Sequence, residues 1–334
     1  MADFDVTRLL RRTGILDAYD AKQARVAEDS LPVEARTYLN PSNQRLLDIQ
    51  DRYARTMADA LQHSQWTRDY ILREISLRAF RRDSAYMWQY RDNLPINYLC
   101  TYYFLKQSVE RDLLEQCTED DLFGVYSVTV DSECVTRDRL DSVCELAFLR
   151  RTLGLKRDSS LTVLDIGSGY GRFAYRMAQC FPSINVLCAD VIPESSFLCE
   201  YYLRYRNLGG VAQMVEFPEL VERLKTTSVD IAVAINSLSE CSSSAIAWWL
   251  NLLRTCGADY LFLVPHAAHD GGRSILSRET EFKMPLDVTQ LLTSYGYREI
   301  ACEPKYHDPL MQKFGVSPTY YHLFERQSLK GQSE

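Results

Sequence analysis

The sequence of 334 residues lacks several features that mark particular protein classes. Its ten cysteines include no pair in C-x-x-C spacing, which argues against a zinc ribbon and a thioredoxin-like motif. No stretch approaches the roughly 18 consecutive apolar residues of a membrane-spanning helix. The first residues lack the apolar run of a secretory signal. We therefore expect a cytoplasmic protein without a membrane partner, in which most cysteines are reduced and buried.

An excess of basic residues is also missing. The chain has 38 Lys and Arg against 45 Asp and Glu, a formal net charge of -7, and neither residues 1–150 nor residues 151–334 are basic. Proteins that bind nucleic acid usually neutralise phosphates with a cationic surface. The charge therefore predicts a small-molecule substrate and no nucleic-acid partner, and it leaves a homodimer open.

Two hydrophobic patterns divide the chain near residue 150. Residues 1–150 place apolar residues at three- and four-residue spacing, which predicts an α-helical N-terminal region. Residues 151–330 alternate short apolar runs with helical patterns, which predicts an α/β domain with a parallel sheet. We expect two domains with these boundaries.

Five strand–helix repeats are predicted in the α/β domain. The strands are expected at 161–166, 184–189, 211–217, 229–235 and 259–264, and the helices at 171–181, 194–207, 218–224, 243–255 and 286–295. Two further strand-like runs, 298–306 and 319–327, follow with no helical crossover between them, so this last pair should be antiparallel. The predicted fold is a seven-stranded mixed sheet.

A glycine-rich segment directly follows the first predicted strand. Residues 167–171, Gly-Ser-Gly-Tyr-Gly, open the first helix of the α/β domain. Glycine lets the backbone approach a ligand closely, and the free N–H groups of a helix N-terminus favour an anionic group. A dinucleotide loop needs G-x-G-x-x-G, but Arg172 stands where the third glycine belongs, which argues against a nicotinamide-dependent oxidoreductase.

The run DIGSGYG, residues 165–171, resembles the first motif of class I S-adenosylmethionine-dependent methyltransferases. Those Rossmann-like enzymes have a seven-stranded sheet that ends in an antiparallel pair. The resemblance implies S-adenosyl-L-methionine as cofactor, with S-adenosyl-L-homocysteine as product. The residues it assigns to the cofactor are Asp165, Gly167, Ser168, Gly169, Gly171, Asp190, Val191, Glu216, Phe217 and Asn236.

Within this set the resemblance implies different roles. Asp190 ends the second predicted strand, and its carboxylate should accept hydrogen bonds from the ribose hydroxyls. Val191 and Ile192 should cover the adenine face, and Glu216 or Phe217 should border the adenine.

A narrower resemblance covers about residues 130 to 330. TRDRLDSVCEL, LCEYYL and DIAVAINSLSEC resemble segments of sugar O-methyltransferases of bacterial natural-product and glycan gene clusters. This implies natural-product biosynthesis and methyl transfer to a hydroxyl of a sugar or glycoside. Two alternatives stay open: a non-sugar acceptor such as a polyketide or peptide oxygen, nitrogen or carbon, and a non-catalytic subunit that binds S-adenosylmethionine.

Methyl transfer to a hydroxyl needs a group that removes its proton. His266 follows the fifth predicted strand and Glu240 the fourth, at the sheet edge where ligands of parallel sheets bind. His266 is the first candidate for the catalytic base and Glu240 the second. Ser237, Glu240 and His269 are expected to bind the substrate, although residues 236–237 could simply turn the chain. No acidic cluster suggests a metal, so none is expected.

Residues 86–104 are unusually rich in aromatic side chains: Tyr86, Trp88, Tyr90, Tyr98, Tyr102, Tyr103 and Phe104. They could form a lid over the acceptor that excludes water. Packing between helices is the more common role of aromatic residues at such spacing, and we favour it.

Overall fold

A computed structural model of the chain describes residues 31–56, 66–82, 84–87, 89, 93–279 and 284–327. The predicted helical segment in residues 1–30 lies outside this part of the chain. In the described residues, no helix combines the length and the apolar composition that crossing a membrane requires.

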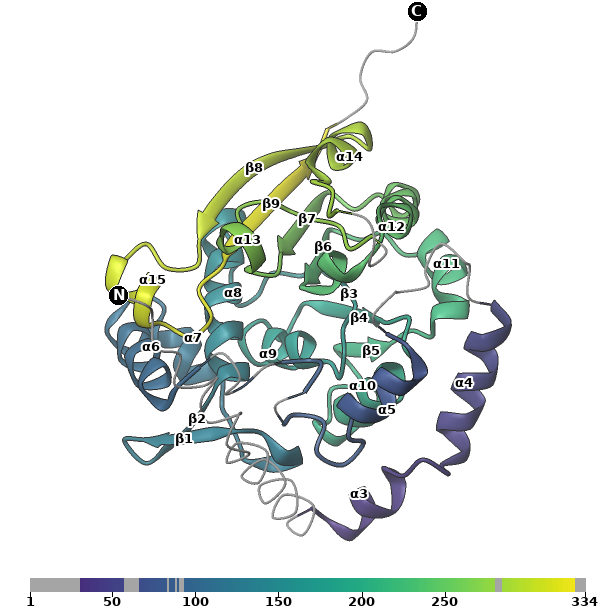
Figure 1. Cartoon of the computed structure of the whole chain (residues 1–334), viewed down its shortest axis with the longest axis horizontal. Helices are drawn as coiled ribbons and strands as arrows, with labels where there is room; N and C mark the ends of the chain where they lie inside the picture. Colours follow the sequence, from purple (N-terminus) through teal and green to yellow (C-terminus); the bar gives the residue numbers. More distant parts are fainter. Residues whose placement is uncertain are drawn as a thin grey trace, which may run out of the picture.

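A seven-stranded sheet forms the centre of the molecule (Figure 1). Its strands are β3 (Thr162–Ile166), β4 (Asn185–Ala189), β5 (Ala212–Met214), β6 (Ile231–Ile235), β7 (Tyr260–Val264), β8 (Tyr297–Pro304) and β9 (Tyr320–Arg326). They lie in the order β5-β4-β3-β6-β7-β9-β8. The first five are parallel, and β9 pairs antiparallel with both β7 and β8. The predicted mixed sheet with an antiparallel last pair is confirmed.

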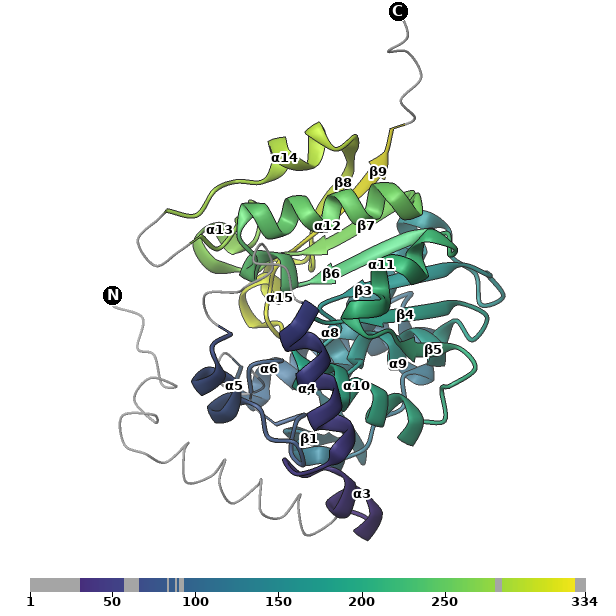
Figure 2. The ribbon, with the colours of Figure 1, turned by 90° about the vertical axis from the view of Figure 1, so that its right-hand side faces the viewer.

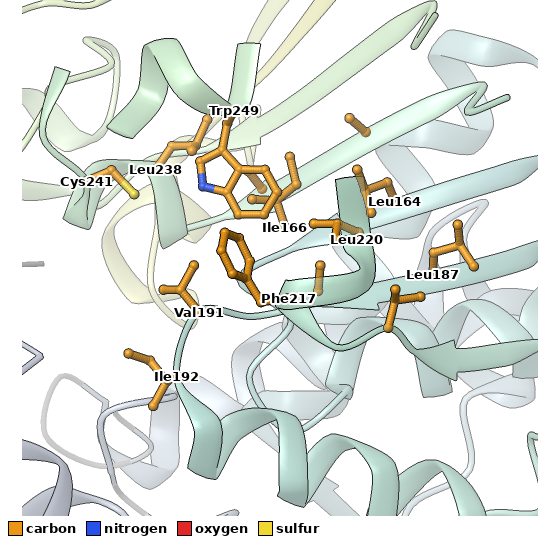
Figure 3. Packing of buried hydrophobic residues seen from close by; sticks show 14 of the residues in the cluster. Leu164, Ile166, Leu187, Val191, Ile192, Phe217, Leu220, Leu238, Cys241 and Trp249 are labelled. Atoms are coloured by element: carbon orange, nitrogen blue, oxygen red, sulfur yellow. The ribbon is translucent and has the colours of Figure 1, made fainter. Parts of the chain in front are cut away.

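Helices cover both faces of this sheet (Figure 2). One face carries α8 (Arg137–Leu153) and α9 (Arg172–Cys180), and the other carries α11 (Phe217–Lys225), α12 (Ser243–Cys256) and α14 (Thr289–Ser294). Successive strand residues therefore alternate between two cores: Val163 packs with α8 and α9, whereas Leu164 and Ile166 pack with α11 and α12 (Figure 3). Burial of both faces explains why the strands are continuous apolar runs.

The N-terminal region packs against the sheet domain. Among the described residues, its helices are α3 (Val33–Tyr38), α4 (Gln44–Thr56), α5 (Arg68–Glu74), α6 (Pro95–Gln107) and α7 (Arg111–Gln116). Helix α4 contacts α11 and α10 (Pro193–Tyr205). The division at residue 150 stays a prediction, and α8 runs across that position.

The prediction that residues 1–150 are wholly helical is wrong. Strands β1 (Ser127–Val130) and β2 (Glu133–Thr136) form an antiparallel hairpin. Asp131 and Ser132 connect them with φ angles of 50° and 66°, the backbone that two-residue hairpin turns require. The β-branched Val and Thr residues in SVTV favour a strand over a helix.

The connection between the last two strands contains a short helix that was not expected, although the two strands are antiparallel as predicted. Helix α15 (Pro309–Phe314) lies between β8 and β9. Asp308 caps it, because its Oδ1 accepts hydrogen bonds from the N–H groups of Leu310 and Met311 at 2.8 and 3.0 Å. Proline at the first helical position after an Asp cap is a local helix signal.

Four buried charged side chains join the N-terminal region to the sheet domain. Arg81 and Arg176 both pair with Glu119 and with Asp138, and all four side chains are at most 1% exposed. Burial alone would raise the pKa of Asp138, but Arg81 and Arg176 hold it well below its usual range. Tyr170, in the glycine-rich loop, donates a hydrogen bond to the same carboxylate. We call Arg81, Glu119, Asp138 and Arg176 the buried ion network.

Asp138→Asn should destabilise the protein, because two buried arginines would lose a counter-ion. Removal of one partner from a buried ion pair typically costs about 3–5 kcal/mol. The free energy of unfolding, measured by urea denaturation, should fall by this order. As a control, Asp51→Asn breaks the exposed pair with Arg55 on α4 and should cost less than about 1 kcal/mol. Equal losses in the two variants would contradict a special role for the network.

Candidate functional site

A cavity of about 870 Å³ lies at the carboxyl ends of β3, β4, β6 and β7. Small-molecule sites usually enclose about 300–1,000 Å³, so this cavity is large enough for a sizeable ligand. Its walls come from both parts of the chain, from residue 66 in the N-terminal region to residue 321 in β9. Parallel sheets of this kind bind ligands at this edge.

Gly167 allows two loops to meet at the floor of the cavity. It has a φ angle of 72°, and a Cβ atom there would lie 2.3 Å from the Cβ of Ser237. Ser237 also donates a hydrogen bond from Oγ to the carbonyl oxygen of Ile166 at 2.6 Å. Any larger residue at 167 would therefore separate the loops after β3 and β6.

Asp190 is held by two backbone donors. The N–H of Gly169 donates to one carboxylate oxygen at 2.9 Å, and the N–H of Ile192 donates to the other at 2.8 Å. Burial raises the pKa of Asp190 to about 7, although these two hydrogen bonds lower it. Each oxygen keeps a lone pair for a ligand hydroxyl.

Asp165 offers the cavity an unsatisfied acceptor. It lies at the end of β3 with its side chain buried, and its Oδ2 has no hydrogen-bond partner in the described structure. Burial raises the pKa of Asp165 to about 7 against the charge of Arg172, which lowers it. Arg172 itself pairs with Glu145 through both terminal nitrogens, at 2.8 and 3.0 Å. An orphaned buried carboxyl fits a ligand that brings a donor or a positive charge.

His266, Glu240 and Trp66 form a polar group at the cavity wall. Nε2 of His266 lies 3.2 Å from Oε1 of Glu240, and the indole N–H of Trp66 donates to Oε2 at 2.9 Å. The Glu240 side chain is 15% exposed and that of His266 is 47% exposed. The carboxylate is thus positioned to orient an imidazole that a ligand can still reach.

Most of the predicted site residues lie together in this cavity. Its lining includes Asp165, Gly167, Ser168, Gly169, Asp190, Val191, Ile192, Asn236, Ser237, Glu240 and His266. Gly171 is not part of the lining. Its φ of 88° and the Sγ atom of Cys199, 3.1 Å from where a Cβ would stand, give it a packing role instead. His269 lies in α13 (Ala268–Gly271), and its side chain is outside the described structure.

Glu216 and Phe217 do not line the cavity. Glu216 pairs with Arg45 and Arg52 of α4, and the Phe217 N–H donates to the hydroxyl of Tyr53 at 2.9 Å. The Phe217 ring packs beside the buried Trp249 (Figure 3). Their role at the adenine stays a prediction: α4 contacts Oε1 of Glu216 and the N–H of Phe217, whereas Oε2 of Glu216 is buried without a hydrogen-bond partner in the described structure.

The aromatic residues of the stretch 86–104 are found in two places, at the cavity and in the core between helices. The Tyr86 ring lies over the glycine loop, 3.0 Å from where a Cβ on Gly169 would stand, and lines the cavity. Tyr98 and Tyr102 are buried in the core beside α8. Trp88 and Tyr90 lie outside the described residues.

Several residues that line the cavity were not predicted from the sequence: Trp66, Tyr70, Arg137, Lys305 and Thr319. Trp66 and Tyr70 form an edge-to-face pair with ring centroids 5.4 Å apart. These residues come from segments far apart in the chain, so no spacing in the sequence links them to the glycine loop.

The sheet order, with β9 inserted antiparallel between β7 and β8, is that of the class I methyltransferase fold. Together with the glycine loop and Asp190, it gives this chain the fold and the cofactor loop of the class I S-adenosylmethionine-dependent methyltransferases. No family model matches the chain.

The curated relatives carry a more particular name. The chain is 28% identical over 153 residues to ribosomal RNA small subunit methyltransferase G of Polaromonas naphthalenivorans (strain CJ2), covering 43% of this chain and 67% of the relative. It is 30% identical over 106 residues to the protein of that name from Paracidovorax citrulli (strain AAC00-1), covering 28% of this chain and 44% of the relative. The match thus spans less than half of the second relative.

Solved structures overlap more loosely. A SAM-dependent methyltransferase from Aquifex aeolicus has 16% sequence identity and a TM-score of 0.39, with 55% of this chain and 89% of the other covered. Magnesium protoporphyrin IX methyltransferase from Synechocystis PCC 6803 has 14% identity and a TM-score of 0.38, with 68% and 96% covered. The fold assignment therefore depends on the sheet order of this chain.

The predicted partners need a correction. We expected a sugar or glycoside substrate and no nucleic acid, whereas the curated relatives are named for ribosomal RNA. The expectation that the protein binds no nucleic acid depended on a net charge of -7, whereas the sugar substrate came from the narrower family resemblance. Net charge sums over the whole surface and therefore says little about the local surface around one cavity.

Cofactor binding should depend on pH through Asp165 and Asp190. A carboxyl group with a pKa near 7 is about half protonated at pH 7, so a cationic ligand should release on the order of half a proton from each. S-adenosylmethionine carries a sulfonium charge that S-adenosylhomocysteine lacks. We expect the first ligand to release more protons than the second, measured by isothermal titration in buffers of different ionisation enthalpy.

Asp190→Asn tests which carboxyl group is responsible. It should remove about half of the proton release. It should also weaken binding by roughly 1.5–3 kcal/mol, the usual contribution of a hydrogen bond to a charged group. Asp48→Asn on the exposed side of α4 serves as the matched control and should change neither quantity. Proton release that is the same in wild type and Asp190→Asn would argue against Asp190 as a ligand-linked group.

Proposed function

We propose that the protein transfers a methyl group from S-adenosylmethionine to a nucleobase of RNA held beside His266 and Glu240. The observation that carries this proposal is the sequence similarity to methyltransferases named for ribosomal RNA. The aromatic and polar cavity wall formed by Trp66, Tyr70, Glu240 and His266 supports it.

The cofactor half of the cavity fits S-adenosylmethionine. When bound, the cofactor supplies an electrophilic methyl group on a positively charged sulfur. Asp190 would accept the ribose hydroxyls with the lone pairs that Gly169 and Ile192 leave free. The glycine loop would admit the methionine portion. The unsatisfied carboxyl of Asp165 would face positive charge or N–H donors.

The other half of the cavity suits a flat, polar acceptor. Unpaired bases are commonly recognised by stacking on aromatic side chains and by hydrogen bonds to their edges. Trp66 and Tyr70 offer aromatic surface, and Glu240 offers a carboxylate beside them. The N-terminal region contributes both aromatic residues, so it belongs to the acceptor site.

In this proposal His266 acts as the general base. Its imidazole would take the proton of the attacking nitrogen or oxygen, and Glu240 would orient the ring and stabilise the imidazolium that forms. The backbone N–H of His266 donates to Oγ of Ser239 at 3.2 Å, which ties the loop after β7 to the loop after β6.

A second candidate is a non-sugar small-molecule acceptor. The cavity of about 870 Å³ favours it, because a space of this size is typical of sites that enclose a small molecule. The two candidates differ in what becomes methylated, so one experiment can separate them.

Purified protein should methylate RNA when it is given S-adenosylmethionine and an unmodified transcript of small-subunit ribosomal RNA. Nucleoside mass spectrometry should find a base that has gained one methylene. Digesting the transcript to nucleosides before the reaction is the control and should abolish transfer. If methyl groups enter a small-molecule extract but no RNA, the RNA acceptor is wrong and the second candidate stands.

His266→Ala should lower turnover about 100-fold, the typical contribution of a general base, while binding of S-adenosylmethionine stays near normal. His307→Ala is the matched control, because His307 forms a similar pair with Glu303 at 3.2 Å on the exposed surface. Single-turnover methyl transfer measures the rate, and calorimetry measures cofactor affinity. If the two variants have the same rate, His266 is not the base.

A further inference from the structure

We propose that His322, Cys302 and Glu299 form a binding site for one thiophilic divalent cation of the Zn²⁺ type. Their ligand atoms, a ring nitrogen, a thiol sulfur and a carboxylate oxygen, all lie within 4.8 Å of one another. None of the three residues lines the cavity, so this site is separate from the one for methyl transfer. This proposal departs from the expectation, made from the sequence, that the protein binds no metal.

The pairing of β8 and β9 brings the three side chains to one face of the sheet. Cys302 and His322 are directly opposed partners across the two antiparallel strands. Glu299 and Cys302 are three positions apart, which in a regular strand would place them on opposite faces. The register shifts between Glu299 and Ala301, and this bulge turns Glu299 to the face of Cys302.

The hydrogen bonds of His322 leave one ring nitrogen for a cation. Nε2 lies 2.9 Å from the carbonyl oxygen of Gly272, which can only accept, so Nε2 carries a proton. Nδ1 lies 2.7 Å from Oε1 of Glu299. A neutral ring would place two lone pairs against each other there. Either a second proton or a metal ion must lie between them.

The surroundings of the ring favour the metal ion. His322 is 2% exposed, and an N–H donated to a backbone carbonyl is the arrangement that usually orients a metal-bound histidine. A set of one nitrogen, one sulfur and one oxygen suits Zn²⁺, with water as the fourth ligand, better than Mg²⁺ or Ca²⁺. Cys302 and Glu299 are exposed, so their side chains can rotate to distances of about 2.0–2.3 Å from the ion. Binding releases the thiol proton of Cys302.

The site connects the sheet to a loop of the methyltransferase cavity. Gly272, whose carbonyl holds His322, has a φ of 90°, and a Cβ there would lie 2.6 Å from Oγ1 of Thr319. Thr319 lines the cavity, and so does His266, which precedes Gly272 by six residues. A bound cation would fix the His322 tautomer and with it this end of the loop, so its role would be structural.

Titration of the metal-free full-length protein with Co²⁺ tests the site. We expect one equivalent to bind with a thiolate-to-cobalt absorption band, and Zn²⁺ to displace it. Cys302→Ser should abolish the band, and Glu299→Gln should weaken affinity about 10- to 100-fold. Cys134→Ser, which changes a half-buried cysteine outside the site, is the matched control. It should leave both the absorption band and the metal affinity unchanged.

Two results would overturn the proposal. One is an absorption band that persists in Cys302→Ser, which would place the metal on a different cysteine. The other is a His322 ring that remains protonated on both nitrogens, by ¹⁵N NMR, when Zn²⁺ is in excess, because the ring would then be an imidazolium paired with Glu299. Binding of S-adenosylhomocysteine shows whether each variant is folded, and none of these measurements depends on the acceptor.

Discussion

The buried ion network of Arg81, Glu119, Asp138 and Arg176 is the constraint on which the site depends. Isolated charges in a protein interior are very unfavourable, so these four side chains must stay together for the chain to remain folded. They belong to the segment after α5, the segment after α7, and helices α8 and α9. Because Tyr170 donates to the same Asp138, the network also fixes the glycine loop. The N-terminal region and the cofactor loop therefore keep one relative position.

The same constraint explains why the cavity belongs to the whole chain. Trp66 and Tyr86 reach the loops after β6 and β3 from the N-terminal region, and Tyr53 on α4 binds the backbone of Phe217. A sheet domain alone would keep Asp165 and Asp190 but would lose the wall opposite them. The N-terminal region thus gives this chain a cavity wall that the shared fold does not specify.

What the sequence could predict follows from which interactions are local. Strands buried on both faces are continuous apolar runs, and the loop at 167–171 is conspicuous because its glycines need positive φ angles, so the sheet and the cofactor loop were predicted. The hairpin at 127–136 was missed because its turn residues, Asp131 and Ser132, are not the usual glycine or asparagine. Trp66 was missed because its contact with Glu240 joins residues far apart in the chain, and such contacts leave no periodic signal.

The position of β9 has a consequence for biosynthesis. Residues 320–326 are made after β7 and β8, yet they lie inside the sheet between these two strands. While a ribosome is still synthesising them, β7 has an open edge, and β8 has no neighbour to pair with. Unpaired strand edges invite pairing with other chains. The nascent protein is therefore prone to aggregation in the interval between the synthesis of β8 and that of β9, and its cavity, which includes Thr319 and Tyr321, is completed only after β9 is made.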